Sequence, residues 1–233
     1  MRLVQIILLV SILFSFHSHT ENYADYLNEI KVDLKKEWPK NRTINLVFHG
    51  HSVPAGYFKT PVVNTLDAYP YQLLKELKEL YPFAVINIIN TSVGGENAES
   101  GEKRFISDVL THKPDVLFID YALNDRRIGL DKAKVAWESM IQQALKKNIK
   151  IILLTPSPDQ KVAILEPNNV LENHAAQIRD LSKSYNIGLV DSYALFQQKV
   201  ASGDSLSTFM SQVNHPNEKG HALITEEILK YFK

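Results

Sequence analysis

The chain contains no cysteine. This absence excludes a disulfide framework, a thiolate metal site and a cysteine nucleophile, so packing must stabilise the fold. An excess of one charge is also absent, because 26 basic side chains balance 26 acidic ones. Such a chain gives no electrostatic reason to expect a nucleic acid or an anionic membrane surface as its partner.

Long hydrophobic runs are scarce as well. The longest runs from Leu3 to Phe16, follows Arg2 and is interrupted by polar residues. It is shorter than the roughly 20 residues that a membrane span needs, and a polar stretch follows it. This pattern is typical of a secretory signal peptide, with an uncleaved anchor helix as the alternative. We therefore predict a signal peptide over residues 1–20, with an approximate cleavage site, and a secreted or periplasmic mature chain that is not inserted in the membrane.

The remaining residues alternate between two periodicities. Short apolar β-prone runs are separated by amphipathic segments of helical spacing, an order that requires crossover connections. It predicts a mainly parallel five-stranded sheet covered on both faces, a three-layer α/β/α sandwich, as a single domain over residues 21–233. The expected strands are Ile44–Phe48, Ala84–Ile89, Val116–Ile119, Ile149–Leu154 and Ile187–Val190, and the expected helices are Tyr23–Trp38, Tyr69–Leu80, Lys103–Thr111, Leu130–Lys147, Val170–Tyr185 and Glu218–Phe232.

Polar residues suited to acyl transfer follow three of these strands. Ser52 comes directly after the first, at the sheet edge where ligands of open α/β sheets bind. Gly95 and Asn124 follow the second and third strands, and His215 lies near the C-terminus. A serine hydroxyl is a poor nucleophile until an imidazole takes its proton, and the tetrahedral intermediate needs hydrogen-bond donors. The four residues supply these roles.

These four blocks, in this order, resemble the SGNH or GDSL-type hydrolase superfamily from about residue 44 to the C-terminus. The resemblance implies a flavodoxin-like SGNH fold and serine esterase activity, with Ser52 as the nucleophile and His215 as the base. It implies an oxyanion hole formed by Ser52, Gly95 and Asn124, and no metal or other cofactor. An exported member of this superfamily is expected to remove short acyl groups, above all acetyl, from a small molecule or a carbohydrate. The sequence does not define the oligomeric state.

The sequence departs from the family pattern at two positions. His51 stands where the first block usually has aspartate, and Gln212 stands three residues before His215, where the family commonly has the aspartate that orients the imidazole. Removing that carboxylate from a serine triad typically costs about 10⁴ in rate. Gln212 could accept the Nδ1–H bond through its amide oxygen and give a Ser–His dyad. Asp159 and Asp191 are the alternative acids, although Asp191 is better explained as a helix N-cap.

Three other interpretations need separate tests. Gly203-Asp204-Ser205-Leu206 spells the family motif literally, but it follows a helical run and no strand delivers Ser205. His49 and His51 stand two residues apart and could be ligands of a metal-dependent hydrolase. The third interpretation is that the chain is a catalytically weak or inactive relative that binds carbohydrate and lost its activity together with the aspartate.

Overall fold

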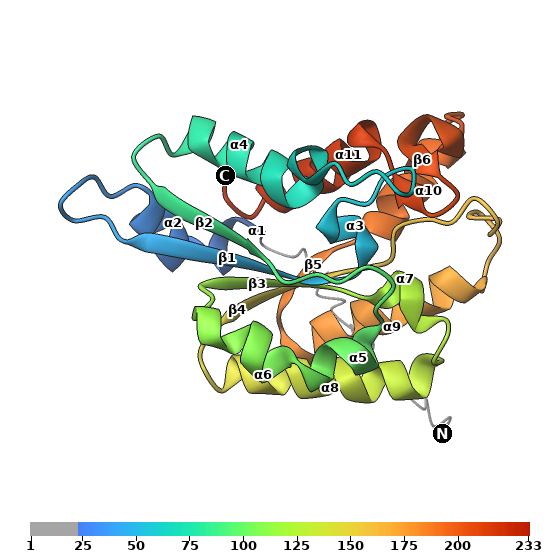
Figure 1. The fold of residues 1–233 in the computed structure, drawn as a ribbon, viewed down its shortest axis with the longest axis horizontal. Helices are drawn as coiled ribbons and strands as arrows, with labels where there is room; N and C mark the ends of the chain where they lie inside the picture. Colours follow the sequence, from blue (N-terminus) through green and yellow to red (C-terminus); the bar gives the residue numbers. More distant parts are fainter. Residues whose placement is uncertain (1–22) are drawn as a thin grey trace, which may run out of the picture.

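The computed structural model describes residues 23–233, and its centre is a sheet of five parallel strands (Figure 1). The strand order is β2-β1-β3-β4-β5, which places β1 between β2 and β3. This arrangement confirms the predicted parallel sheet, and each strand begins or ends within a few residues of its expected position. The strands are β1 (Thr43–Gly50), β2 (Val85–Asn90), β3 (Val116–Asp120), β4 (Lys150–Leu154) and β5 (Gly188–Val190).

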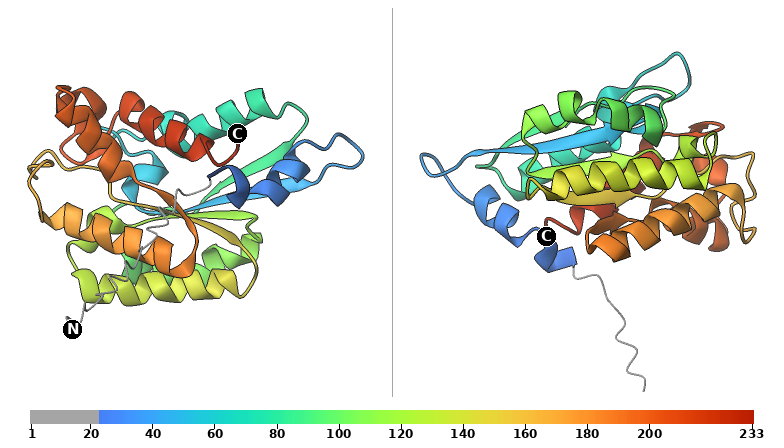
Figure 2. Two further views of the ribbon diagram at one scale, coloured as in Figure 1. Left: turned by 180° about the vertical axis from the view of Figure 1, so that it is seen from behind. Right: turned by 90° about the horizontal axis from the view of Figure 1, so that it is seen from below.

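Helices cover both faces of the sheet, as Figures 1 and 2 show. Successive strand residues point to opposite faces, so Phe48 packs in one core layer and Val47 in the other. The layer of Phe48 includes α4 (Tyr69–Leu80), α10 (Ser192–Ala201) and α11 (Glu218–Leu229). The layer of Val47 includes α5 (Ala98–Lys103), α6 (Phe105–Asp108), α8 (Leu130–Leu145) and the second half of α9 (Val170–Tyr185).

Two of the predicted helices are broken. The one expected over Tyr23–Trp38 forms α1 (Tyr23–Tyr26) and α2 (Asn28–Leu34), because Leu27 leaves helical geometry at ψ 23°. The one expected over Lys103–Thr111 is divided among α5, α6 and a 3₁₀ turn, η2 (Leu110–His112). The break between α5 and α6 falls at Arg104, which has φ −108° and ψ 6°.

Several one-turn elements escaped the sequence analysis because they are too short to show a period. The helix α3 (Ser52–Ala55) follows β1, and α7 (Ala122–Asp125) follows β3. Two short antiparallel strands, β6 (Met210–Gln212) and β7 (His215–Pro216), pair so that Gln212 lies opposite His215. The remaining elements are the 3₁₀ turns η1 (Thr65–Asp67) and η3 (Leu206–Phe209).

The predicted signal peptide, residues 1–20, lies outside the described residues. Within 23–233, no helix is both long enough and apolar enough to cross a bilayer.

Candidate active site

Ser52 is the first residue of α3, immediately beyond the carboxyl end of β1, which lies between β2 and β3. His51 caps this helix, since its Nδ1 accepts a hydrogen bond from the Val53 amide at 3.2 Å. Gly50 allows the close approach of β3, because a Cβ there would lie 2.5 Å from the Asp120 carbonyl oxygen. Ser52 is only 7% exposed, so it is buried at this edge of the sheet and not presented at the surface as its position after the strand suggests.

The Ser52 hydroxyl meets the imidazole of His215. Ser52 Oγ and His215 Nε2 are 2.9 Å apart, although 163 positions separate the two residues in the chain. The other ring nitrogen, Nδ1, lies 2.9 Å from the carbonyl oxygen of Phe58. A carbonyl oxygen can only accept, so Nδ1 carries the proton and Nε2 is left to accept from the serine hydroxyl. Burial lowers the pKa of His215, although the Phe58 contact opposes this, and the ring is therefore neutral at pH 7.

Gln212 touches the same imidazole, but not through the atom that the sequence analysis expected. Its Nε2 lies 2.7 Å from His215 Nδ1, while its Oε1 accepts from the Thr60 amide at 3.1 Å. The Nδ1–H group of His215 and the Nε2 group of Gln212 are then both donors. The Gln212 amide therefore offers the ring no acceptor in this orientation. The acceptor is the Phe58 carbonyl. Sequence reasoning missed it because a backbone carbonyl has no residue-type signature.

The two alternative acids have other partners. Asp159 forms an ion pair of 2.7 Å with Arg126. Asp191 forms an ion pair of 2.6 Å with Arg179 and accepts from the Ala194 amide at 3.2 Å, as the predicted N-cap of α10. In the described part of the chain, neither carboxylate is a hydrogen-bond partner of His215.

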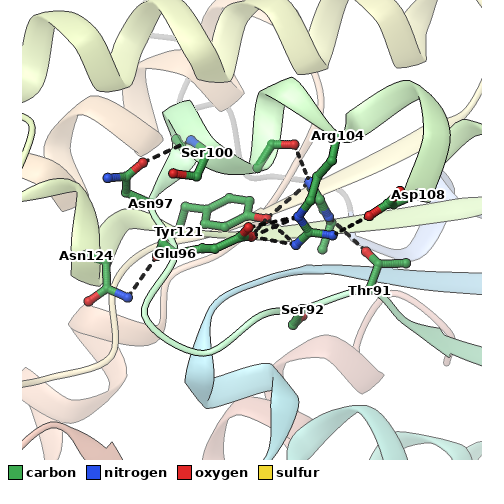
Figure 3. Close-up of polar contacts among 12 residues, drawn as sticks. Thr91, Ser92, Glu96, Asn97, Ser100, Arg104, Asp108, Tyr121 and Asn124 are labelled. Atoms are coloured by element: carbon green, nitrogen blue, oxygen red, sulfur yellow. Dashed lines mark hydrogen bonds and ion pairs between the residues drawn. The ribbon is translucent and has the colours of Figure 1, made fainter.

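Gly95 and Asn124 meet beside the end of β1. Val93, Gly94, Gly95 and Glu96 form a tight turn in which Gly95 has φ +83°, a conformation that favours glycine. The Val93 amide donates to the carbonyl of Gly50 at 3.0 Å, which fixes this turn to β1. Asn124 Nδ2 donates to the Glu96 carbonyl at 2.8 Å (Figure 3). The Glu96 carbonyl uses one of the two Nδ2 hydrogens of Asn124, so the other remains a donor beside the turn that carries the Gly95 amide.

The histidine pair of the metal hypothesis is engaged in protein contacts. His49 Nδ1 lies 2.8 Å from Thr91 Oγ1, and its Nε2 lies 3.1 Å from the carbonyl of Gly101. His51 caps α3 through Nδ1, and its Nε2 faces the buried Asp120 carboxylate at 3.3 Å. Among residues 23–233, no cluster of three His, Asp or Glu side chains has a geometry suited to a metal ion. These contacts give the metal-dependent alternative no support.

Ser205, the serine of the literal motif, has a different environment. It is exposed, precedes η3, and contacts Ser207 Oγ at 2.8 Å through its own hydroxyl.

Comparison with known proteins identifies the family of the chain. The pattern of the GDSL-like lipase/acylhydrolase family matches residues 48–223, most of the chain. The chain belongs to this family. This GDSL-like acylhydrolase is accordingly a carboxylic ester hydrolase, and its sheet with helices on both sides is the SGNH esterase fold.

Individual relatives of this acylhydrolase are distant. An acetylxylan esterase of Geobacillus stearothermophilus is 20% identical over 66% of this chain and 75% of its own length. An uncharacterised lipoprotein of Bacillus subtilis is 28% identical over 48% of this chain, and the match spans 56% of the lipoprotein.

Two solved structures have the same fold. The structure of the acetylxylan esterase superimposes with a TM-score of 0.71, at 20% identity, over 81% of this chain and 94% of that one. A two-domain esterase active on acetylated mannans gives a TM-score of 0.72, at 20% identity, over 89% of this chain and 52% of that one.

Proposed function

We propose that this acylhydrolase is an exported serine esterase that removes acetyl or other short acyl groups from carbohydrate. Ser52 is the nucleophile and His215 the general base, and the amides of Ser52 and Gly95 with the Asn124 side chain form the oxyanion hole. The observation that carries the proposal is the 2.9 Å contact between Ser52 Oγ and a His215 ring whose Nδ1 is already a donor.

The acylation step follows from this geometry. As Ser52 Oγ forms a bond to the ester carbon, its proton passes to His215 Nε2 and the carbonyl electrons move to the oxygen. The three donors stabilise the negative charge that develops on this oxygen. When the intermediate collapses, the bond to the alcohol oxygen breaks and His215 returns the proton to it. In deacylation, water gives a proton to the same nitrogen as its oxygen bonds to the acyl carbon; the bond to Ser52 Oγ then breaks, His215 returns the proton to Oγ, and the carboxylic acid is released.

The relatives and one aromatic side chain support a carbohydrate ester as substrate. The similar proteins include an acetylxylan esterase and an esterase active on acetylated mannans. Tyr57 is partly exposed and its ring centroid lies 6.2 Å from that of His215. The ring also packs against Gly94, where a Cβ would come within 3.1 Å of it. Tyr57 thus lies beside His215, the proposed base, and beside the turn that contains Gly95. An aromatic ring at this place can pack against a sugar.

Two experiments test the proposed function. A serine-reactive fluorophosphonate, followed by peptide mapping, should label Ser52. The protein of residues 21–233 should release acetate from acetylated xylan and p-nitrophenol from p-nitrophenyl acetate, and should act poorly on long-chain esters. Binding of xylan without turnover would favour the inactive carbohydrate-binding alternative, and loss of turnover with a chelator would favour the metal-dependent one.

The neutral Gln212 gives a prediction about pH dependence. The variant Gln212→Asp places a carboxylate beside His215 Nδ1, which should raise the pKa of the ring. The base must be neutral to accept the Ser52 proton, so activity is lost as pH falls through this pKa. The acidic limb of a kcat/KM profile should therefore move to higher pH, with activity at alkaline pH equal to or above that of the parent.

Matched variants separate this effect from a general change of charge. Gln142→Asp adds the same charge on an exposed position of α8, in the other core layer, and should leave the limb unmoved. Gln212→Ala should cost activity only modestly, because the Phe58 carbonyl still orients the ring. An unmoved limb in Gln212→Asp would mean that His215 is not the group that titrates.

A further inference from the structure

Four side chains behind the Gly95 turn form a half-buried polar network. Arg104 binds the carboxylate of Glu96 with two nitrogens, through Nε at 3.0 Å and Nη2 at 2.6 Å (Figure 3). The Tyr121 hydroxyl donates to the same carboxylate at 3.3 Å and lies 3.1 Å from His49 Nε2. The Arg104 and Glu96 side chains are only 19% and 17% exposed, so water screens this pair less than a surface ion pair.

The shifted pKa values of Tyr121 and His49 fix the donors and acceptors of the network. Burial raises the pKa of the Tyr121 hydroxyl, which therefore keeps its proton and donates it. Burial, and then the charge of Arg104, lower the pKa of His49 to about 3, so its ring is neutral. The Gly101 carbonyl can only accept, which assigns the proton of His49 to Nε2. The contacts consequently form a consistent set of donors and acceptors.

The network holds Glu96, which connects two of the three proposed oxyanion donors, the Gly95 amide and the Asn124 side chain. Glu96 directly follows Gly95, whose amide is one donor, and its carbonyl binds Asn124 Nδ2, the other. Tyr121 adds a second connection. Its backbone carbonyl accepts from the backbone N–H of Asn124 at 3.0 Å, and its hydroxyl donates to the Glu96 carboxylate. A shift of the Glu96 side chain would therefore displace both donors together.

From this arrangement we infer that Arg104 is a positioning residue of the esterase: by fixing the Glu96 carboxylate it holds Gly95 and Asn124 at the oxyanion. The inference rests on the proposed function. The bidentate geometry explains why arginine suits this position, because its planar fork fixes the direction of a carboxylate and not only its distance. Gly101 fits the same interpretation, since a Cβ there would lie 2.3 Å from the Tyr121 hydroxyl and would displace it.

The test compares Arg104→Ala with Arg42→Ala. Arg104 pairs with Asp108 at 3.1 Å as well as with Glu96. Arg42 likewise pairs with two carboxylates, Asp33 and Asp115, but it precedes the amino end of β1, away from Ser52. We expect Arg104→Ala to lower kcat for p-nitrophenyl acetate by about 10²-fold, the loss typical of a misplaced catalytic group, with KM nearly unchanged. Fluorophosphonate labelling of Ser52 should slow in parallel, because its transition state also places negative charge in the hole. Arg42→Ala should lower thermal stability and leave kcat within about threefold.

Rescue and a conservative variant distinguish positioning from folding. Millimolar guanidinium ion should restore part of the kcat of Arg104→Ala by occupying the vacated site on Glu96, and should not affect Arg42→Ala. Tyr121→Phe removes a single hydroxyl and should lower kcat by about fivefold, which corresponds to one hydrogen bond. If Arg104→Ala fails to fold, Tyr121→Phe decides. If the parent protein is active and the folded variant keeps its kcat, the positioning role of Arg104 is overturned and the proposed function stands. If the parent protein is inactive and its Ser52 resists labelling, the proposed function is overturned, and this inference with it.

Discussion

Replacing Ser52 by alanine should abolish ester hydrolysis, with kcat falling by about 10⁶, the loss measured when a serine protease loses its nucleophile. The variant lacks the atom that forms the acyl-enzyme, and His215 Nε2 loses its 2.9 Å partner. The fold should persist, because the change deletes one hydroxyl on a helix whose cap comes from His51. Turnover of p-nitrophenyl acetate measures the loss of activity, and circular dichroism measures whether the fold persists.

Ser205→Ala is the matched control. This serine belongs to the literal Gly-Asp-Ser sequence, but its hydroxyl is exposed and bonds to Ser207. The variant should retain kcat within a few-fold. Equal losses in the two variants, or fluorophosphonate found on Ser205, would show that the nucleophile has been assigned to the wrong serine.

Asn124→Ala is expected to have the second largest effect. It removes one oxyanion donor and the bond to the Glu96 carbonyl, and kcat should fall by about 10² to 10³. KM should change little, because the lost hydrogen bond strengthens only as charge develops on the substrate oxygen.

Asn169→Ala provides a comparison of the same chemical change. Asn169 caps α9 through the amides of Leu171 and Glu172, so its loss should cost about 1 kcal/mol of stability while kcat stays near that of the parent. If Asn124→Ala retained its kcat, Asn124 would have no part in the oxyanion hole.

The sequence was sufficient for the sheet and the long helices because their residues have a strong period. The ends of α4 and α9 agree with the expected Tyr69–Leu80 and Val170–Tyr185 to the residue, since each presents a long amphipathic pattern. The break at Arg104 could not be predicted, because the periodic pattern of apolar residues continues through it. Its backbone departs from the helix where its side chain binds Glu96.

The candidate site also contains residues that the sequence predicts and residues that it does not. Ser52, Gly95, Asn124 and His215 stand in motifs, and the structure brings Ser52 to His215 and Asn124 to the Gly95 turn. Phe58 takes part through its carbonyl alone, which any residue could supply. Glu96 and Arg104 belong to no motif and become neighbours only because the chain turns back at α5. Their roles depend on three-dimensional contacts that a single sequence does not encode in a pattern.

The pairing of Ser52 with His215 also has a consequence for biosynthesis. Ser52 lies near the start of the described chain and His215 near its end, with the four other strands of the sheet between them. A nascent chain emerges N-terminus first, so its serine has no base until β7 is made and docked. The proposed nucleophile therefore lacks its proposed base until synthesis of the chain is nearly complete. On refolding, recovery of activity should report closure of the contact between Ser52 and His215, a measurement separate from the formation of the sheet.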